Sequence, residues 1–311
     1  MSYPDLITVV DNMPPVVTAL APDTVAVGLR EMVSIDLDTL FSDPDNDGLS
    51  YSVSTSNVFV AQAQITGNSS LSFDGTDDYV DMGTPSNLLM DYVTVSAWVY
   101  PDWEGDYDYV VSRELGYVLR YQGNSLFFVV TINNESANTT EEYWGTYTTS
   151  TNKNEWAHVV GTYDGDTSKL YVNGVLKSSD DSPSGKLAID SSAPFRIGNA
   201  YCCQDREFKG NINEVAIWDE ALSAVEIAAL YNSGYAMNAV DNSGDYTSSS
   251  NLQGYWKMNE GTGTKLTDLS GNGNNGTITG ATWNDNRALE ITGVWPNETD
   301  LVIEADDGRV D

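Results

Sequence analysis

Short runs of alternating apolar and polar residues recur along most of this 311-residue chain, separated by Gly, Asn, Asp and Ser. The clearest run is Lys169–Lys177, where Asn173-Gly174 is the two-residue turn typical of a β-hairpin. Such a rhythm predicts an all-β protein built as a β-sandwich. Other strands are expected at Val93–Tyr100, Gly116–Tyr121, Leu126–Ile132 and Trp156–Tyr163.

One short helix is expected on this β framework, at Ala224–Asn232. Ser223 is placed to cap its first turn, Glu226 completes a capping box, and Gly234 follows its end. The single histidine, His158, falls inside a strand pattern, so we expect a packed structural residue rather than a catalyst.

The charge is strongly acidic, with 46 Asp and Glu against 14 Lys and Arg and a formal net charge of −32. Such a field repels nucleic acid and anionic membranes. The acids cluster with Asn and Gly in short segments, which favours bound calcium. Solubility or adaptation to salt is the alternative explanation.

No apolar run reaches the roughly 18 residues that a membrane-spanning helix needs. The first ten residues lack the pattern of a signal peptide. A missing signal peptide is unexpected for an extracellular protein. We therefore interpret the chain as a monomeric segment of a longer extracellular protein, with Met1 an expression start.

The only two cysteines, Cys202 and Cys203, are adjacent. In an oxidising compartment they can close on each other as a vicinal disulfide, whereas in a reducing one they stay free thiols. The sequence leaves both alternatives open.

The middle of the chain resembles the laminin-G-like, concanavalin-type jelly roll of extracellular proteins. The likeness is carried by Leu71–Val80, Val95–Val99, Trp156–Gly165 and Phe208–Trp218. A further family stretch, Leu252–Gly261 with Asp268–Thr277, precedes the Phe-Asp-Gly segment in many relatives but comes last here. We expect one jelly roll with permuted order, which requires that its two ends lie close together.

The flanks resemble a bacterial cadherin-like or Ig-like module cut in two. Pro14–Ile65 carries the opening strands, with the signature Phe41–Val53. The expected continuation is missing there but present in Leu289–Val294 and Asp300–Gly308. We therefore expect a split cadherin-like domain of residues 1–66 plus 288–311, interrupted by a laminin-G-like domain of residues 67–287. Two unrelated linkers are the alternative.

Calcium is the expected cofactor of both domains. Asp43-Pro-Asp-Asn-Asp-Gly48 has the spacing of a calcium loop, although no EF-hand surrounds it. The cadherin-like resemblance adds linker acids, and the jelly-roll resemblance adds a structural site with two alternative ligand sets. The candidate ligands are Asp11, Asn12, Asp43, Asp45, Asp47, Asp306 and Asp307 in the flanks, then Asn213, Asp268 and Asn272, or Asp74 and Asp77.

The candidate ligand-binding loop is Ile197–Phe208, which resembles the position where the related pentraxins place calcium-binding Gln and Asp. Ser112-Arg-Glu114 lies at the other calcium loop of that comparison. The resemblance implies oxygen ligands or sugar contacts at Glu114, Gln204, Asp205 and Glu207, with Glu114 and Asp205 also as metal ligands. The candidates for stacking on a sugar ring are Tyr201, Trp103, Tyr107 and Tyr109, and the candidates for binding an anionic group are Arg113 and Arg206. Cys202–Cys203, if closed as a disulfide, would add a rigid apolar surface. An irregular surface loop is the alternative.

No catalytic pattern is found. The Glu-x-Asp-x-x-Glu strand pattern of the glucanases of this fold is missing, and Glu214 and Asp219 are spaced to face opposite sides of a strand. We therefore expect not an enzyme but a calcium-dependent carbohydrate-binding module of a bacterial surface adhesin. Its expected partners are extracellular glycans and neighbouring domains of the same chain. The alternatives are a protein-binding or structural spacer, or an accessory module of a secreted glycan-degrading enzyme.

Overall fold

The computed structural model describes residues 70–102, 107–134, 139–148, 153–188, 190–202, 205–232 and 236–284, and the backbone of several strands in the flanks. The chain divides into two compact units. One unit holds residues 70–258 and 263–284, and the other holds residues 1–69, 259–262 and 285–311. We call the first the jelly-roll unit and the second the flank unit.

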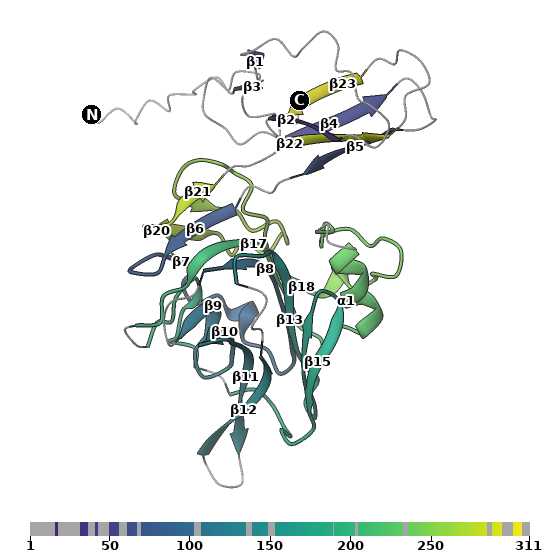
Figure 1. Ribbon diagram of the computed structural model, residues 1–311. Helices are drawn as coiled ribbons and strands as arrows, with labels where there is room; N and C mark the ends of the chain where they lie inside the picture. Colours follow the sequence, from purple (N-terminus) through teal and green to yellow (C-terminus); the bar gives the residue numbers. More distant parts are fainter. Residues whose placement is uncertain are drawn as a thin grey trace, which may run out of the picture. The chain divides into compact units, whose positions relative to one another are not determined.

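The jelly-roll unit is a sandwich of two antiparallel sheets (Figure 1), as the alternating runs predicted. The first, which we call the front sheet, has the order β12-β11-β10-β9-β16-β7-β20-β19. Its strands are β7 (Tyr79–Asp81), β9 (Asp108–Arg113), β10 (Tyr117–Gln122), β11 (Ser125–Asn134), β12 (Thr139–Thr148), β16 (Phe195–Ile197), β19 (Lys265–Leu266) and β20 (Gly276–Thr279).

The second sheet, which we call the back sheet, has the order β15-β14-β13-β8-β17-β6-β21, and β18 also pairs with β17. Its strands are β6 (Ser70–Asp74), β8 (Val93–Pro101), β13 (Ala157–Tyr163), β14 (Ser168–Val172), β15 (Val175–Asp180), β17 (Lys209–Trp218), β18 (Leu252–Trp256) and β21 (Thr282–Asn284). Short 3-10 helices lie at Ser86–Leu88 and Ser249–Asn251. The turn between β14 and β15 has positive φ at both Asn173 and Gly174, which is the backbone that the Asn-Gly pair predicted.

The permuted C-terminal stretch belongs to the same sandwich. β20 pairs with β7 in the front sheet, whereas β18 and β21 pair with β17 and β6 in the back sheet. The two ends of the unit meet, because Ser70 and Asn284 are register partners between β6 and β21. The permuted order is therefore accommodated by one domain.

A continuous apolar core fills the space between the sheets. Alternate residues of β10 and β11, such as Leu119 and Phe128, are completely buried in it. Trp256 stacks on Phe195 with ring centroids 5.3 Å apart, and its indole N–H donates to the carbonyl of Asn274 at 2.9 Å. Gly161 in the back sheet lets Phe128 approach, because a Cβ there would lie 2.2 Å from the ring. Burial of such aromatic side chains is the main stabilising contribution.

Helix α1 (Ala224–Tyr231) lies beside β15 and β18 (Figure 1) and covers the outer side of the back sheet. Its predicted capping box is confirmed, since Ser223 and Glu226 exchange side-chain to backbone hydrogen bonds. The helix ends one residue early, because Asn232 adopts the left-handed conformation with φ of 44°. Gly234, which we expected after the helix, lies outside the described residues.

Polar groups are buried under this helix. His158 is 2% exposed, hydrogen-bonds through Nε2 to Ser96 Oγ at 2.8 Å and stacks on Trp98, which confirms its expected packed role. Glu214 sits at an irregularity of β17 with φ of 49° and contacts the hydroxyl of Tyr255. Burial raises the pKa of Glu214 to about 7.

Apart from residues 259–262, the flank unit is described only through its strand backbones. β2 (Met32–Asp36), β22 (Ala288–Gly293) and β5 (Ala61–Thr66) form one sheet, whereas β4 (Ser50–Thr55) pairs with β23 (Leu301–Asp306) and β1 (Val16–Val17) pairs with β3 (Phe41–Ser42). Thr66 and Ala288 are register partners at the ends of β5 and β22. Strands from before and after the jelly-roll unit therefore pair with each other, while a cadherin-like identity stays a prediction.

Candidate functional site

The outer face of the front sheet carries a cluster of aromatic and charged side chains. Strand alternation puts it there: Leu119 and Tyr121 of β10 point into the core, so Val118 and Arg120 point outward. The register extends the face across the sheet, because Arg120 lies opposite both Tyr109 and Phe127. We call this surface the arginine–aromatic face and define it by Tyr107, Tyr109, Arg120, Phe127, Trp144 and Arg206.

Arg120 lies at the centre of this face. Its guanidinium carbon lies 5.0 Å from the ring centre of Tyr107, 5.8 Å from Tyr109, 4.8 Å from Phe127 and 5.5 Å from Trp144. Nη1 donates to Oε1 of Gln122 at 2.8 Å, and the residue is only 4% exposed. Cation–π contacts of this kind are worth about 0.5–2 kcal/mol each. Arg120 therefore holds the surrounding rings in fixed positions.

Trp144 presents the largest aromatic surface to solvent. It is 48% exposed and packs edge-on against Phe127, with ring centroids 6.0 Å apart at 84°. β12, which carries it, is the edge strand of the front sheet, and Trp144 lies opposite Val129. A fixed, half-exposed indole of this kind suits the apolar C–H side of a sugar ring.

Two glutamates lie among the arginines. Burial raises the pKa of Glu114, while Arg206 partly offsets that rise and Glu142 adds to it. Oε1 of Glu114 is buried without a hydrogen-bond partner among the described residues. Burial likewise raises the pKa of Tyr109 and lowers that of Arg120. The face thus combines apolar rings, two cations and two carboxyl groups.

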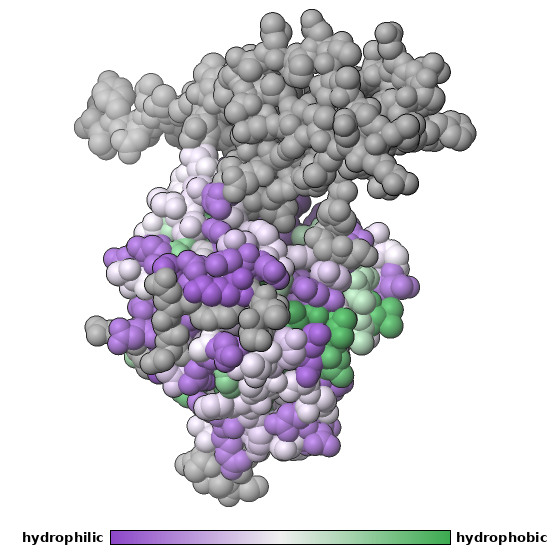
Figure 2. Space-filling model, viewed as in Figure 1, coloured by the Kyte–Doolittle hydropathy of each residue, from purple (hydrophilic) through white to green (hydrophobic). Residues whose placement is uncertain are grey.

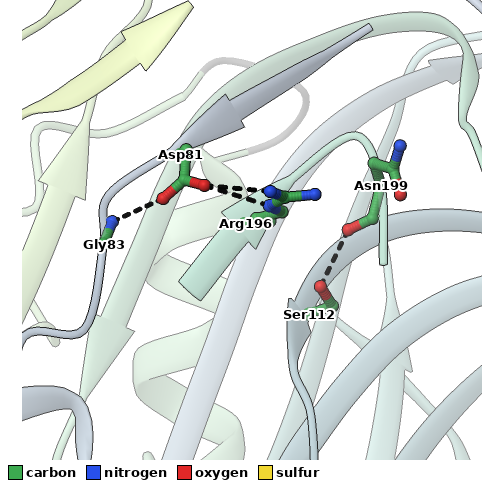
Figure 3. Close-up of polar contacts among 5 residues, drawn as sticks. All are labelled: Asp81, Gly83, Ser112, Arg196 and Asn199. Atoms are coloured by element: carbon green, nitrogen blue, oxygen red, sulfur yellow. Dashed lines mark hydrogen bonds and ion pairs between the residues drawn. The ribbon is translucent and has the colours of Figure 1, made fainter. Parts of the chain in front are cut away.

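A network of polar contacts continues this face along the front sheet (Figure 3). Arg196 Nε and Nη2 each donate to Oδ2 of Asp81 at 3.1 Å, and the other oxygen of Asp81 accepts the N–H of Gly83 at 2.7 Å. Ser112 Oγ donates to the carbonyl of Asn199 at 2.8 Å. The Arg196–Asp81 pair joins β16 to β7, and the Ser112–Asn199 contact fastens the start of the predicted ligand loop to β9.

The rest of that loop is only partly described. Tyr201 is 56% exposed, and the Arg196 guanidinium carbon lies 5.2 Å from its ring centre. Glu207 accepts a long hydrogen bond of 3.5 Å from Asn199 Nδ2, while Asp205 is exposed with φ of 62°. Cys202 is also exposed. Cys203, Gln204 and Trp103 lie outside the described residues, so the vicinal disulfide remains a prediction.

The structure brings together four of the predicted ligand-binding residues: Tyr107, Tyr109, Glu114 and Arg206. Arg113 plays another part, because it is 2% exposed and its guanidinium donates to the carbonyls of Ala193 and Asp190. The sequence reasoning missed three members of the face, Arg120, Phe127 and Trp144, and the neighbouring Glu142. Correct pairing of β10, β11 and β12 would have revealed them, since all four point to the same side.

The predicted calcium ligands fall into separate groups. Asp74 and Asp77 meet a third acid, Asp78, with one oxygen from each within 4.8 Å of the others. Asp78 is 5% exposed, and its carboxylate accepts the backbone N–H of Asp74 at 2.8 Å. Burial raises the pKa of Asp78, and Asp74 and Asp77 add to that rise. This donor set fits a hard cation such as calcium, which prefers several carboxylate oxygens.

The other predicted set of calcium ligands, which is Asn213, Asp268 and Asn272, is already engaged in hydrogen bonds. Asp268 accepts the backbone N–H groups of Tyr255, Ser270 and Asn274 at 2.8–3.0 Å. Asn272 Nδ2 donates to backbone carbonyls, and Asn213 Oδ1 accepts the N–H of the residue that follows it. The flank candidates Asp11, Asn12, Asp43, Asp45, Asp47 and Asp307 lie outside the described residues, and Asp306 is described only as strand backbone.

Residues 74–228 match the family model of the concanavalin A-like lectin/glucanases superfamily. No curated protein matches the sequence significantly. Among solved structures, a protein from Bacteroides ovatus, provisionally described as carbohydrate-binding, superposes with a TM-score of 0.54 at 21% identity, over 70% of this chain and 60% of its own. The chain thus spans 60% of that protein's length, and the likeness is one of fold.

Two further similar structures superpose less well. A heptameric pentraxin from Limulus polyphemus has a TM-score of 0.42 and 14% identity, over 53% of this chain and 82% of its own. Domain 4 of an extracellular arabinanase from Geobacillus stearothermophilus, solved with arabinotriose, has a TM-score of 0.41 and 19% identity, over 61% of this chain and 92% of its own. The family match and the two antiparallel sheets give the jelly-roll unit the lectin-like, concanavalin-type fold expected from the sequence.

Proposed function

We propose that the jelly-roll unit is a calcium-dependent carbohydrate-binding module of an extracellular bacterial adhesin, and that the arginine–aromatic face is its glycan site. The observation that carries this proposal is the half-exposed Trp144, held on a row of rings around Arg120. Binding sites commonly combine apolar and aromatic walls with a few polar groups that set orientation. The provisional description of the Bacteroides ovatus protein as carbohydrate-binding agrees with this proposal.

The chemistry of the face suits a sugar. Trp144 and Phe127 offer apolar ring surface, while Glu114, with its unpartnered Oε1, offers an acceptor for a sugar hydroxyl. A buried acceptor without a partner costs free energy that a hydroxyl donor can recover. We propose binding rather than catalysis, because these groups stack, accept and orient without an evident nucleophile and base arrangement.

The proposal includes calcium at two places in the jelly-roll unit. Asp74, Asp77 and Asp78 would hold one ion at the turn between β6 and β7, which belong to different sheets. The ion would neutralise three crowded carboxylates and fasten the two sheets there. At the ligand loop, Glu114 and Asp205 are the proposed oxygen ligands of an ion that would coordinate vicinal sugar hydroxyls when bound.

A glycan array probed with the full chain tests the proposal. We expect binding in calcium, weaker binding after chelation with EDTA, and weaker binding in Trp144→Ala. Trp156→Ala is the matched control, since Trp156 is also exposed, at 38%, but directly precedes β13 of the back sheet. Binding of unchanged strength in Trp144→Ala would refute the location of the site, and binding of unchanged strength in both EDTA and Asp205→Ala would refute the calcium mechanism.

A protein partner is the second candidate, and one observation favours it. Val175, Leu176 and Val225 are all about half exposed, and an apolar area shows beside α1 and β15 (Figure 2). Exposed apolar patches often mark interaction sites. If no glycan binds, this patch and the role of a spacer in a long chain become the better account.

A further inference from the structure

In the part of the chain that the structure describes, the arginines of this acidic protein are concentrated around one sheet. The chain has only 14 basic residues against 46 acidic ones. Yet all four arginines whose side chains are described lie in the front sheet or the loop that follows β16: Arg113, Arg120, Arg196 and Arg206. Arginine differs from lysine in offering a planar fork of donors that matches a carboxylate.

Three of these arginines have internal partners. Arg113 donates to two backbone carbonyls, Arg196 forms an ion pair with Asp81, and Arg120 donates to Gln122 among four rings. They hold the sheet and its rings in place. Their hydrogen-bonding capacity is therefore partly or fully used within the protein.

Arg206 differs from them. Its guanidinium carbon lies 3.8 Å from the ring centre of Tyr107 and 5.6 Å from that of Tyr109. In the described part of the chain its guanidinium has neither a hydrogen bond nor an ion pair, and the residue is partly exposed. Stacking on a ring fixes the plane of a guanidinium but leaves its N–H groups unused. Arg206 is thus an oriented cation with free donors at the edge of the proposed glycan site.

We infer that the arginine–aromatic face takes an acidic saccharide, whose carboxylate is bound by Arg206 while a sugar ring stacks on the exposed aromatic surface. This inference rests on the proposed function and names the class of ligand. Both kinds of contact are needed together: the rings select a saccharide, and the free guanidinium selects one that carries a carboxylate.

The negative charge of the protein does not oppose this assignment at contact distance. At a salt concentration of about 0.15 M, exposed charges further than about 8 Å apart are largely screened, so the −32 charge slows the approach of an anion more than it weakens an ion pair at contact distance. Arg206 is partly exposed beside the ring of Tyr107, so a carboxylate can reach its N–H groups from solvent. The direct ion pair between Arg206 and the carboxylate of the saccharide then outweighs the repulsion from more distant acids.

A paired panel of saccharides tests the inference on the full chain. The panel contains oligosaccharides of uronic acids and sialic acid together with the same oligosaccharides after reduction of their carboxyl groups. Hydrogen bonds to charged groups are worth about 1.5–3 kcal/mol, so we expect the acidic members to bind roughly 10- to 100-fold more tightly than their reduced partners. Arg206→Gln should remove that difference, and Arg206→Lys should restore only part of it.

Lys265→Gln is the matched control, because it removes one positive charge from β19 at the opposite edge of the front sheet. It should leave the preference unchanged. Equal binding of acidic and reduced members, or a preference that persists in Arg206→Gln, would overturn the inference while leaving glycan binding intact. A preference lost in EDTA but kept in Arg206→Gln would assign the carboxylate to calcium instead and also overturn it. No binding to any member would overturn the proposed function itself.

Discussion

Raising the pH from about 5 to about 8 should destabilise the jelly-roll unit through the buried carboxyl group of Glu214. Glu214 is 7% exposed, and its carboxylate oxygen accepts a hydrogen bond from the hydroxyl of Tyr255. Burial raises its pKa from 4.5 to about 7, and Lys257 and Tyr255 only partly counter that rise. The folded state therefore holds a proton that the unfolded chain releases at lower pH.

The sign and size of the effect follow from proton linkage. Below pH 4.5 Glu214 is protonated in both the folded and the unfolded state, so its ionisation does not change the free energy of unfolding. Between pH 4.5 and about 7 only the unfolded state ionises, so the free energy of unfolding falls by about 1.4 kcal/mol per pH unit. Above that range the loss is constant. Between about pH 5 and pH 8 the expected loss is roughly 2–3 kcal/mol.

Urea unfolding, followed by fluorescence of the buried tryptophans, measures this loss in the full chain. Glu214→Gln keeps the shape and the contact with Tyr255 but cannot ionise, so its unfolding free energy should fall less over the same pH range. Glu155→Gln is the matched control, because Glu155 is exposed and shares only the change in net charge. An equal pH dependence in wild type and Glu214→Gln, or a wild type that gains stability as pH rises, would refute the reasoning.

Three further predictions concern single side chains. Trp144→Ala should weaken glycan binding about 2- to 10-fold in titration calorimetry and lower the melting temperature by only a few degrees, because the indole is half exposed. Ser223→Ala should lower the free energy of unfolding by about 1 kcal/mol through loss of the α1 cap, whereas Ser223→Asp should keep it. Asp268→Ala should cost roughly 2–3 kcal/mol, since three backbone N–H groups lose their acceptor, and an unchanged urea midpoint would refute that role.

Local patterns in the sequence predicted most of the fold. Asn173-Gly174 located a hairpin, and the Ser223–Glu226 spacing located the one helix, because each is a short-range rule of backbone geometry. The strand at Val93–Tyr100 was predicted to within a residue of β8. The permuted order also followed from the sequence, through the family stretches at its end.

The candidate site was predictable only in part, because it depends on contacts between strands. Tyr107 and Tyr109 were predicted as stacking residues and Arg206 as an anion-binding residue, but Arg120 and Trp144 lie in the middle of strands with no motif around them. Their proximity follows from the register of β10, β11 and β12 and from the irregularity between Leu119 and Arg120. A shift of one residue would turn each of these side chains to the other face.

The pairing of chain ends has a consequence for the order of folding. Thr66 and Ala288 pair across 221 intervening residues, which as an unstructured loop would make closure of β5 on β22 entropically costly. Loop-closure entropy grows with the logarithm of length, and the folded jelly-roll unit, whose own ends pair at Ser70 and Asn284, reduces the free part to about six residues. The entropic free-energy cost of pairing β5 with β22 is thereby lower by roughly 3 kcal/mol. We therefore expect the jelly-roll unit to fold first, and substitutions that unfold it to weaken the flank pairing as well.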